Sequence, residues 1–266
     1  LKLNYINTYK ENPIYGYNYK FKLYDFGSNY FYNRHNKLYY YFGYQQLNLD
    51  CENELCSNIL ENSIFQFYYS RFDYLIDKRD IFIDPNFGYY FNLNFIVKND
   101  FKNKKFNHYP LIITFQKFFK THFKELVFSI KSKLLYQFGT PPIIAKKYIG
   151  GEDYIRGYSP IPNLNHKKYS DLIEGFHIIY QSIELQNTLL KRKNYLIDSN
   201  TGIEFGVDYI IFIDAGLTSN NIKSINIDNG LIGYGLGLKF FISNFPPIEL
   251  SLGFNPKGQC FLHFND

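Results

Sequence analysis

The chain has 266 residues but no Trp, no Met and only three cysteines. Because Met is missing even from position 1, we expect the chain to begin inside a longer gene product or to have been processed. No charged segment followed by an apolar one opens the chain. Because we expect the true start to lie upstream, that says nothing about secretion. No run of about 18 apolar residues occurs, which excludes a transmembrane helix.

The residue groupings of common active sites are also missing. Cys51 and Cys56 could close a small disulfide in an oxidising compartment or stay free thiols, and no Cys/His group has the spacing of zinc ligands. No Ser lies in a G-x-S-x-G context, and no glycine-rich loop opens a phosphate-binding helix. His177 and His263 lie far apart on predicted strands, where a lone histidine is more often packed than a ligand. We expect no enzyme activity, catalytic residue, cofactor or metal.

The chain carries only a slight excess of positive charge. The formal net charge is +5, and the basic residues are scattered along the chain, so no nucleic-acid partner is indicated. The abundant residues are aromatic, with 27 Tyr and 28 Phe.

Apolar and polar residues alternate along most of the chain. The alternation is clear at residues 14–24, 65–70, 89–95, 232–240 and 248–254, where every second residue is Tyr, Phe, Leu or Ile. A period of two is the pattern of a β-strand with one apolar face. We predict about twelve strands of roughly 9–13 residues, and no segment has a sustained helical period.

Two all-β architectures use such strands. A soluble sandwich has strands of about five or six residues, whereas a transmembrane barrel needs about 9–11, with apolar faces toward lipid and polar faces toward the lumen. Tight turns at 84–88 and 254–258 alternate with long polar loops at 48–58, 149–170 and 218–229. We therefore predict an antiparallel transmembrane β-barrel formed by one domain, residues 1–266.

One glycine-rich stretch, GGEDYIRGYSP at 150–160, differs from the rest of the chain. Its residues Gly150, Gly151, Ile155, Arg156, Gly157 and Tyr158 resemble the (V/I)-R-G-(F/Y) motif of the outer-membrane assembly factor superfamily, the BamA, TamA and FhaC-like proteins with a bacterial surface antigen barrel. The segment from Phe212 to Gly216 is similar to the F-x-D-x-G strand of that family, and Glu184 falls where the family has an inward glutamate. Asp77, Arg79, Asp80, Pro85 and Gly88 also fit a family pattern.

The resemblance implies a barrel of sixteen strands with POTRA repeats upstream. It favours a bacterial outer membrane, with an organellar outer membrane as the alternative. It implies that the motif loop lies between strands eleven and twelve and folds into the lumen. Five predicted strands follow the loop and about seven precede it, so we expect this chain to hold the last twelve or so strands. The implied function is insertion of unfolded outer-membrane proteins into the bilayer, with accessory lipoproteins as further partners; polypeptide export and passive conduction are the alternatives.

The residues themselves suggest what the motif does. Period two places Glu184 and Asp214 on the polar faces of their strands, pointing into the lumen. The planar fork of Arg156 suits carboxylates, so we predict that it binds both acids and fixes the loop, adding about 1–3 kcal/mol. We expect Gly157 to permit the turn and Tyr158 to pack on the wall. The alternative is a solvated Arg156, and we expect Glu152 and Asp153 to be solvated.

The last predicted strand runs from Gly258 to Phe264. Cys260, Leu262 and Phe264 alternate there with Gln259, Phe261 and His263. An unpaired edge on this strand could template a client strand through backbone hydrogen bonds.

Overall fold

The computed structural model describes residues 2–12, 17–51, 64–102, 104–123, 125–159, 173–198, 201–243 and 245–265. Twelve strands form one antiparallel sheet, and two short strands, β8 and β9, form a second. The strands are β1 (Lys2–Asn12), β2 (Tyr17–Phe31), β3 (Asn36–Cys51), β4 (Ile64–Asp77), β5 (Gly88–Asp100), β6 (His108–Lys120), β7 (Val127–Gly139), β8 (Lys147–Tyr148), β9 (Glu174–Gly175), β10 (His177–Asp198), β11 (Thr201–Ser219), β12 (Leu231–Ile242), β13 (Ile248–Phe254) and β14 (Cys260–Asn265). The 3₁₀ turns are η1 (Ile143–Ala145), η2 (Ile222–Ser224) and η3 (Ile227–Asn229).

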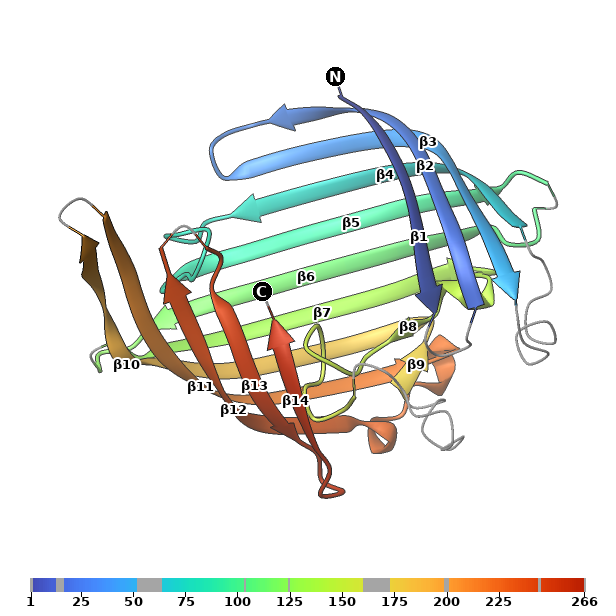
Figure 1. Ribbon diagram of the computed structural model, residues 1–266. Coiled ribbons are helices and arrows are strands. Elements are labelled where there is room, and N and C mark those ends of the chain that lie inside the picture. The colour runs from blue at the N-terminus through green and yellow to red at the C-terminus, as the bar shows by residue number, and fades with distance from the viewer. Residues whose placement is uncertain are drawn as a thin grey trace.

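The large sheet is a transmembrane-type partial barrel. Its strands are hydrogen-bonded in chain order from β1 to β14, with only β8 and β9 left out. Figure 1 shows the sheet curling around a concave interior, with β1 and β14 as its two edges. The prediction of about twelve strands is confirmed, with seven before the motif loop and five after it. No helix among the described residues is long and apolar enough to cross a membrane.

The antiparallel order gives the barrel two distinct ends. The strands β1, β3, β5, β7, β11 and β13 run toward one of them, which we call the motif-loop end. The strands β2, β4, β6, β10, β12 and β14 run toward the opposite end. The strands β10 and β11 are the longest, with 22 and 19 residues, whereas β13 and β14 have only 7 and 6.

The two faces of the C-terminal strands differ as predicted. Ile211, Ile213 and Leu236 are exposed on the outer face, while Asp208 and Asp214 are buried on the inner face. An apolar exterior and a polar interior are what a barrel wall in lipid requires.

The N-terminal strands correct part of the prediction. Phe65 and Phe67 belong to the face that we expected to meet lipid, but both are buried, with Leu49, in a cluster that Phe106 and Ile144 cover. On β2, the apolar Leu23 is likewise buried on the same face as Asp25. Both faces of these strands carry aromatic residues, so alternation alone did not identify the lipid-facing side.

Candidate functional site: the Arg156 lumen lock

Arg156 lies in the loop between β7 and β10 and is buried against the inner wall, with 4% of its surface exposed. Its Nε and Nη2 donate to the two carboxylate oxygens of Asp214, each at 2.9 Å. The backbone N–H of Arg156 also donates to Asp214 Oδ2, at 3.0 Å. Asp214 is fully buried, so one carboxylate fixes both the side chain and the backbone of the motif.

Two further carboxylates complete the arrangement. Arg156 Nη2 lies 2.6 Å from Glu184 Oε1 on β10, and Nη1 lies 3.1 Å from Glu249 Oε1 on β13. The guanidinium carbon also sits 3.5 Å from the centre of the Phe212 ring, the geometry of a cation–π contact. We call Arg156, Glu184, Asp214, Glu249 and Phe212 the lumen lock.

The side chain of Arg156 stays positively charged in these surroundings. Burial alone would lower the pKa of the guanidinium, but Glu184, Asp214 and Glu249 outweigh burial and raise that pKa above its ordinary value. A permanently charged cation among three carboxylates is a positioning device. It binds and orients the loop, and its proton does not take part in chemistry.

The loop around Arg156 is folded on itself. Gly151 donates its backbone N–H to the carbonyls of Ile155 and Tyr158, at 3.2 and 3.1 Å, and Tyr148 Oη donates to the Ser159 carbonyl at 2.6 Å. Gly151 has a φ of 96°, in the region that favours glycine. The loop therefore presents Arg156 from a compact hairpin rather than from an extended chain.

The expected role of Gly157 is corrected. Its backbone is not among those with positive φ, so the turn does not require glycine there. A Cβ on Gly157 would instead overlap the Phe254 carbonyl oxygen and lie 2.7 Å from the Gly233 Cα. Glycine is needed at this position because the loop backbone contacts the barrel wall directly.

Apolar residues anchor the same loop. Ile155 and Tyr158 are buried in a cluster with Ile149, Ile178 and Leu231. The loop is therefore held by apolar packing as well as by the ion pairs of Arg156.

This geometry explains the spacing of the F-x-D-x-G segment. Phe212, Asp214 and Gly216 are alternate residues on the inner face of β11. Phe212 stacks on Arg156 and Asp214 binds it. Gly216 leaves room for Ile155, since a Cβ at Gly216 would lie 2.7 Å from the Ile155 Cδ1.

The end of the chain also contacts the loop. His263 Nε2 on β14 lies 2.6 Å from the Arg156 carbonyl oxygen. In the turn before β14, Asn255 Nδ2 donates to the Gly157 carbonyl at 2.9 Å. The loop thus contacts β14 as well as β10, β11 and β13.

The two acids beside the motif differ in their surroundings. Glu152 Oε2 is 3.6 Å from His263 Nδ1, so Glu152 is not simply solvated as expected. Asp153 is exposed, which agrees with the expectation.

The last strand is shorter than predicted. It begins at Cys260, so Gly258 and Gln259 lie in the preceding turn and are not part of its edge. Gly258 has a φ of 78° there. Cys260 is an exposed free thiol. Leu262 and Phe264 are also exposed, whereas His263 on the other face is buried and Phe261 is partly buried. Cys51 and Cys56, which could form a disulfide or stay free thiols, lie outside the residues whose side chains are described.

Sequence reasoning did not assign Glu249, Asn255 or His263 to the loop. Glu249 could have been found, because it alternates with Ile248 and Leu250 and so belongs to the polar face of β13. Asn255 and His263 act on backbone carbonyls of the loop. Nothing in a sequence pattern marks a residue for that role.

Comparison with known proteins agrees with the geometry. The model of the Omp85 superfamily domain matches residues 2–265, while none of the curated proteins matches the chain significantly. The crystal structure of BamA from Haemophilus ducreyi lacking POTRA domains 1–3 is 16% identical, with a TM-score of 0.70 over 99% of this chain and 56% of that one. CdiB from Escherichia coli is 14% identical, with a TM-score of 0.59 over 97% of this chain and 47% of that one.

The chain therefore spans about half the length of these solved structures. Their low identity supports the shared fold alone, and the family match extends over nearly all of the chain. This chain belongs to the Omp85 superfamily of outer-membrane β-barrel proteins.

Proposed function

We propose that this chain is the barrel of an insertase that folds client β-barrel proteins into a bacterial outer membrane. The observation that carries the proposal is the lumen lock, which attaches one loop to β10, β11 and β13, while His263 attaches it to β14. The loop can thereby hold the last strands in one arrangement while a client is added.

The proposed mechanism needs no covalent step and no cofactor. Among the described residues, β14 is hydrogen-bonded only to β13, so its other edge is unpaired within them. Such an edge can pair with an incoming strand. The clients are unfolded outer-membrane proteins, the bilayer is the second partner, and accessory lipoproteins are further partners in this proposal.

The test uses the full-length protein in lipid vesicles with a urea-denatured outer-membrane protein as client. Arg156→Ala is expected to lower the rate of client folding at least about fivefold, a loss of about 1 kcal/mol in barrier lowering, measured by protease protection and heat-modifiable gel mobility. Arg34→Ala is the matched control, because Arg34 is exposed in the β2–β3 turn at the opposite end. Equal client folding by both variants and the wild type would contradict the proposal.

Polypeptide export by the same fold is the competing function. The lock buries the motif loop against the inner wall, where an exported chain would have to pass. The vesicle assay separates the two functions, because an exported client enters the vesicle interior and an inserted one stays in the bilayer. A passive porin would instead conduct ions steadily, whether or not Arg156 is present.

A further inference from the structure

A second segment crosses the lumen at the end opposite the motif loop. It is the turn between β4 and β5, residues 78–87, and its own polar residues fix its shape. The Asp80 carboxylate accepts the backbone N–H of Asn86 at 3.0 Å, and Asp77 and Arg79 form a two-bond ion pair at 2.7 and 2.9 Å. Asp84, at the tip, has a φ of 59°, which is unusual for a residue other than glycine.

The Asp84 side chain binds residues of distant strands. Its Oδ1 accepts from Gln186 Nε2 on β10 and from Lys239 Nζ on β12, each at 2.9 Å. Its Oδ2 accepts from Arg192 Nη2, also on β10. The carboxylate is thus held by three donors, two of them cationic.

The β4–β5 turn and β12 are not neighbours in the sheet. The strands β6, β7, β10 and β11 separate β5 from β12 in the sheet. At about 4.8 Å per strand, five steps correspond to roughly 24 Å along the curved wall. The turn must therefore reach across the concave interior to meet Lys239.

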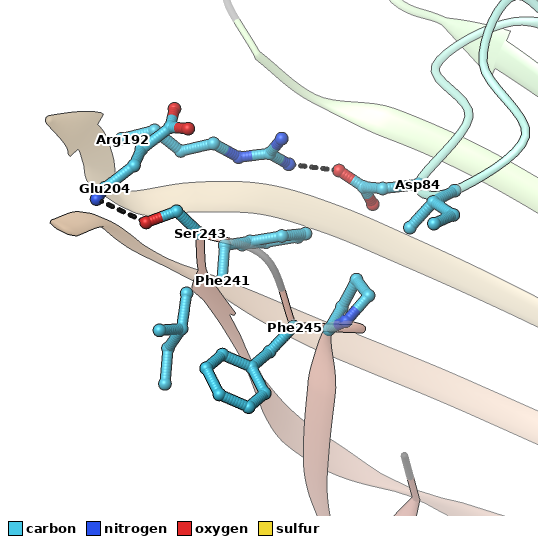
Figure 2. A pocket seen from close by; sticks show the side chains of 9 residues that line it. Asp84, Arg192, Glu204, Phe241, Ser243 and Phe245 are labelled. Carbon is cyan, nitrogen blue, oxygen red and sulfur yellow. Dashed lines mark hydrogen bonds and ion pairs between the residues drawn. The ribbon is translucent and has the colours of Figure 1, made fainter. Parts of the chain in front are cut away.

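The β10 residues that bind Asp84 are held in place by contacts of their own. The guanidinium of Arg192 lies over the Phe241 ring at 3.7 Å, and Gln186 also donates to Asp208 at 2.7 Å. Figure 2 shows Arg192 extended along the wall toward Asp84, with Phe241 beside it. A cavity of about 240 Å³ opens next to this contact, and its lining includes Glu204, Ser243 and Phe245.

The attachment depends on charge rather than on apolar packing. Ile81, Phe82 and Phe87 of the same turn are exposed. Burial would raise the pKa of Asp84, but Lys239, Gln186 and Arg192 outweigh burial and lower it. The contact can therefore separate without exposing an apolar core.

We propose that the β4–β5 turn is a releasable latch that spans this end of the lumen, held by Asp84 against Gln186, Arg192 and Lys239. Ions or a polypeptide can pass this end only when the latch is open. The inference rests on the geometry of the turn and holds for an insertase or an exporter alike.

The test measures ion conductance of the full-length protein in planar lipid bilayers. Asp84→Asn keeps the shape of the side chain but removes its charge, and is expected to raise the fraction of time in conducting states at least about threefold, because the two cations lose their ion pairs. Glu204→Gln is the matched control, because Glu204 lines the same cavity and forms no ion pair among the described residues. A folded Asp84→Asn protein that conducts like the wild type and the control overturns the latch.

A cross-link keeps the proposal testable if Asp84→Asn does not fold. Asp84→Cys and Lys239→Cys are combined with Cys51→Ser, Cys56→Ser and Cys260→Ser. Because the contact is made through the long Lys239 side chain, a short bis-methanethiosulfonate reagent, rather than a direct disulfide, bridges the two new cysteines. The cross-linked protein is expected to conduct at the wild-type level, and reductive cleavage of the cross-link to raise conductance at least about threefold. Failure of the reagent to join the two cysteines in folded protein, or conductance that is unchanged by reduction, overturns the latch. Client folding is not part of this readout, so the insertase proposal can fail separately.

Discussion

The lumen lock and the latch are two solutions to one problem, attaching a connecting segment to the inside of a barrel. The lock places one cation among three carboxylates and adds the apolar anchors Ile155 and Tyr158. The latch places one carboxylate among two cations and an amide, and the apolar residues of its turn stay exposed. The comparison indicates a permanent attachment at one end and a releasable one at the other.

The largest expected effect comes from the lock. Asp214→Asn removes the carboxylate that takes three bonds from Arg156 and leaves the guanidinium buried with less compensation. We expect a loss of about 3 kcal/mol in the free energy of unfolding, measured by urea denaturation in lipid vesicles.

The other two carboxylates provide the graded control. The side chain of Glu249 is 18% exposed, and we expect Glu249→Gln to lower the free energy of unfolding by about 1–2 kcal/mol. The side chain of Glu184 is 31% exposed, so solvent screens its ion pair with Arg156. We expect Glu184→Gln to lower the free energy of unfolding by less than about 1 kcal/mol. Equal losses for all three acids would show that burial does not rank the partners of Arg156.

The backbone contact of the lock gives the next effect. Gly157→Ala places a Cβ against the Phe254 carbonyl and 2.7 Å from the Gly233 Cα, and overpacking of this kind costs about 1–3 kcal/mol. In Gly258→Ala the new Cβ meets nothing within 4 Å, so only the positive φ of this residue is unfavourable for alanine. We expect this substitution to lower the free energy of unfolding by about 1 kcal/mol. Denaturation of both variants measures the difference, and a larger loss for Gly258→Ala would refute the close-packing role of Gly157.

Strand periodicity predicted the lock better than the latch for physical reasons. Glu184 and Asp214 follow from periodicity together with a family motif, and both are bound to Arg156. Asp84 lies in a turn, where no periodicity indicates direction, and its partners Gln186 and Lys239 are 102 and 155 residues away.

The outward orientation expected for Phe65 and Phe67 failed for a different reason. Phe106 and Ile144, which lie in connecting segments, cover this pair on the inside of the barrel. An apolar side chain suits either lipid or a packed interior, so its position in a strand does not reveal which one it meets.

The smallest effect tests whether lock and latch act independently. Lys239, which binds Asp84, is the register partner of Glu249, which binds Arg156. When Asp84 is neutralised, Lys239 loses a partner and can pair more strongly with Glu249. We expect a double-mutant cycle of Asp84→Asn and Glu249→Gln to deviate from additivity by about 0.5–1 kcal/mol in unfolding free energy. Asp84→Asn with Asp228→Asn is the control cycle, because Asp228 is exposed at the motif-loop end; additivity in both cycles would mean that the two ends of the lumen are uncoupled.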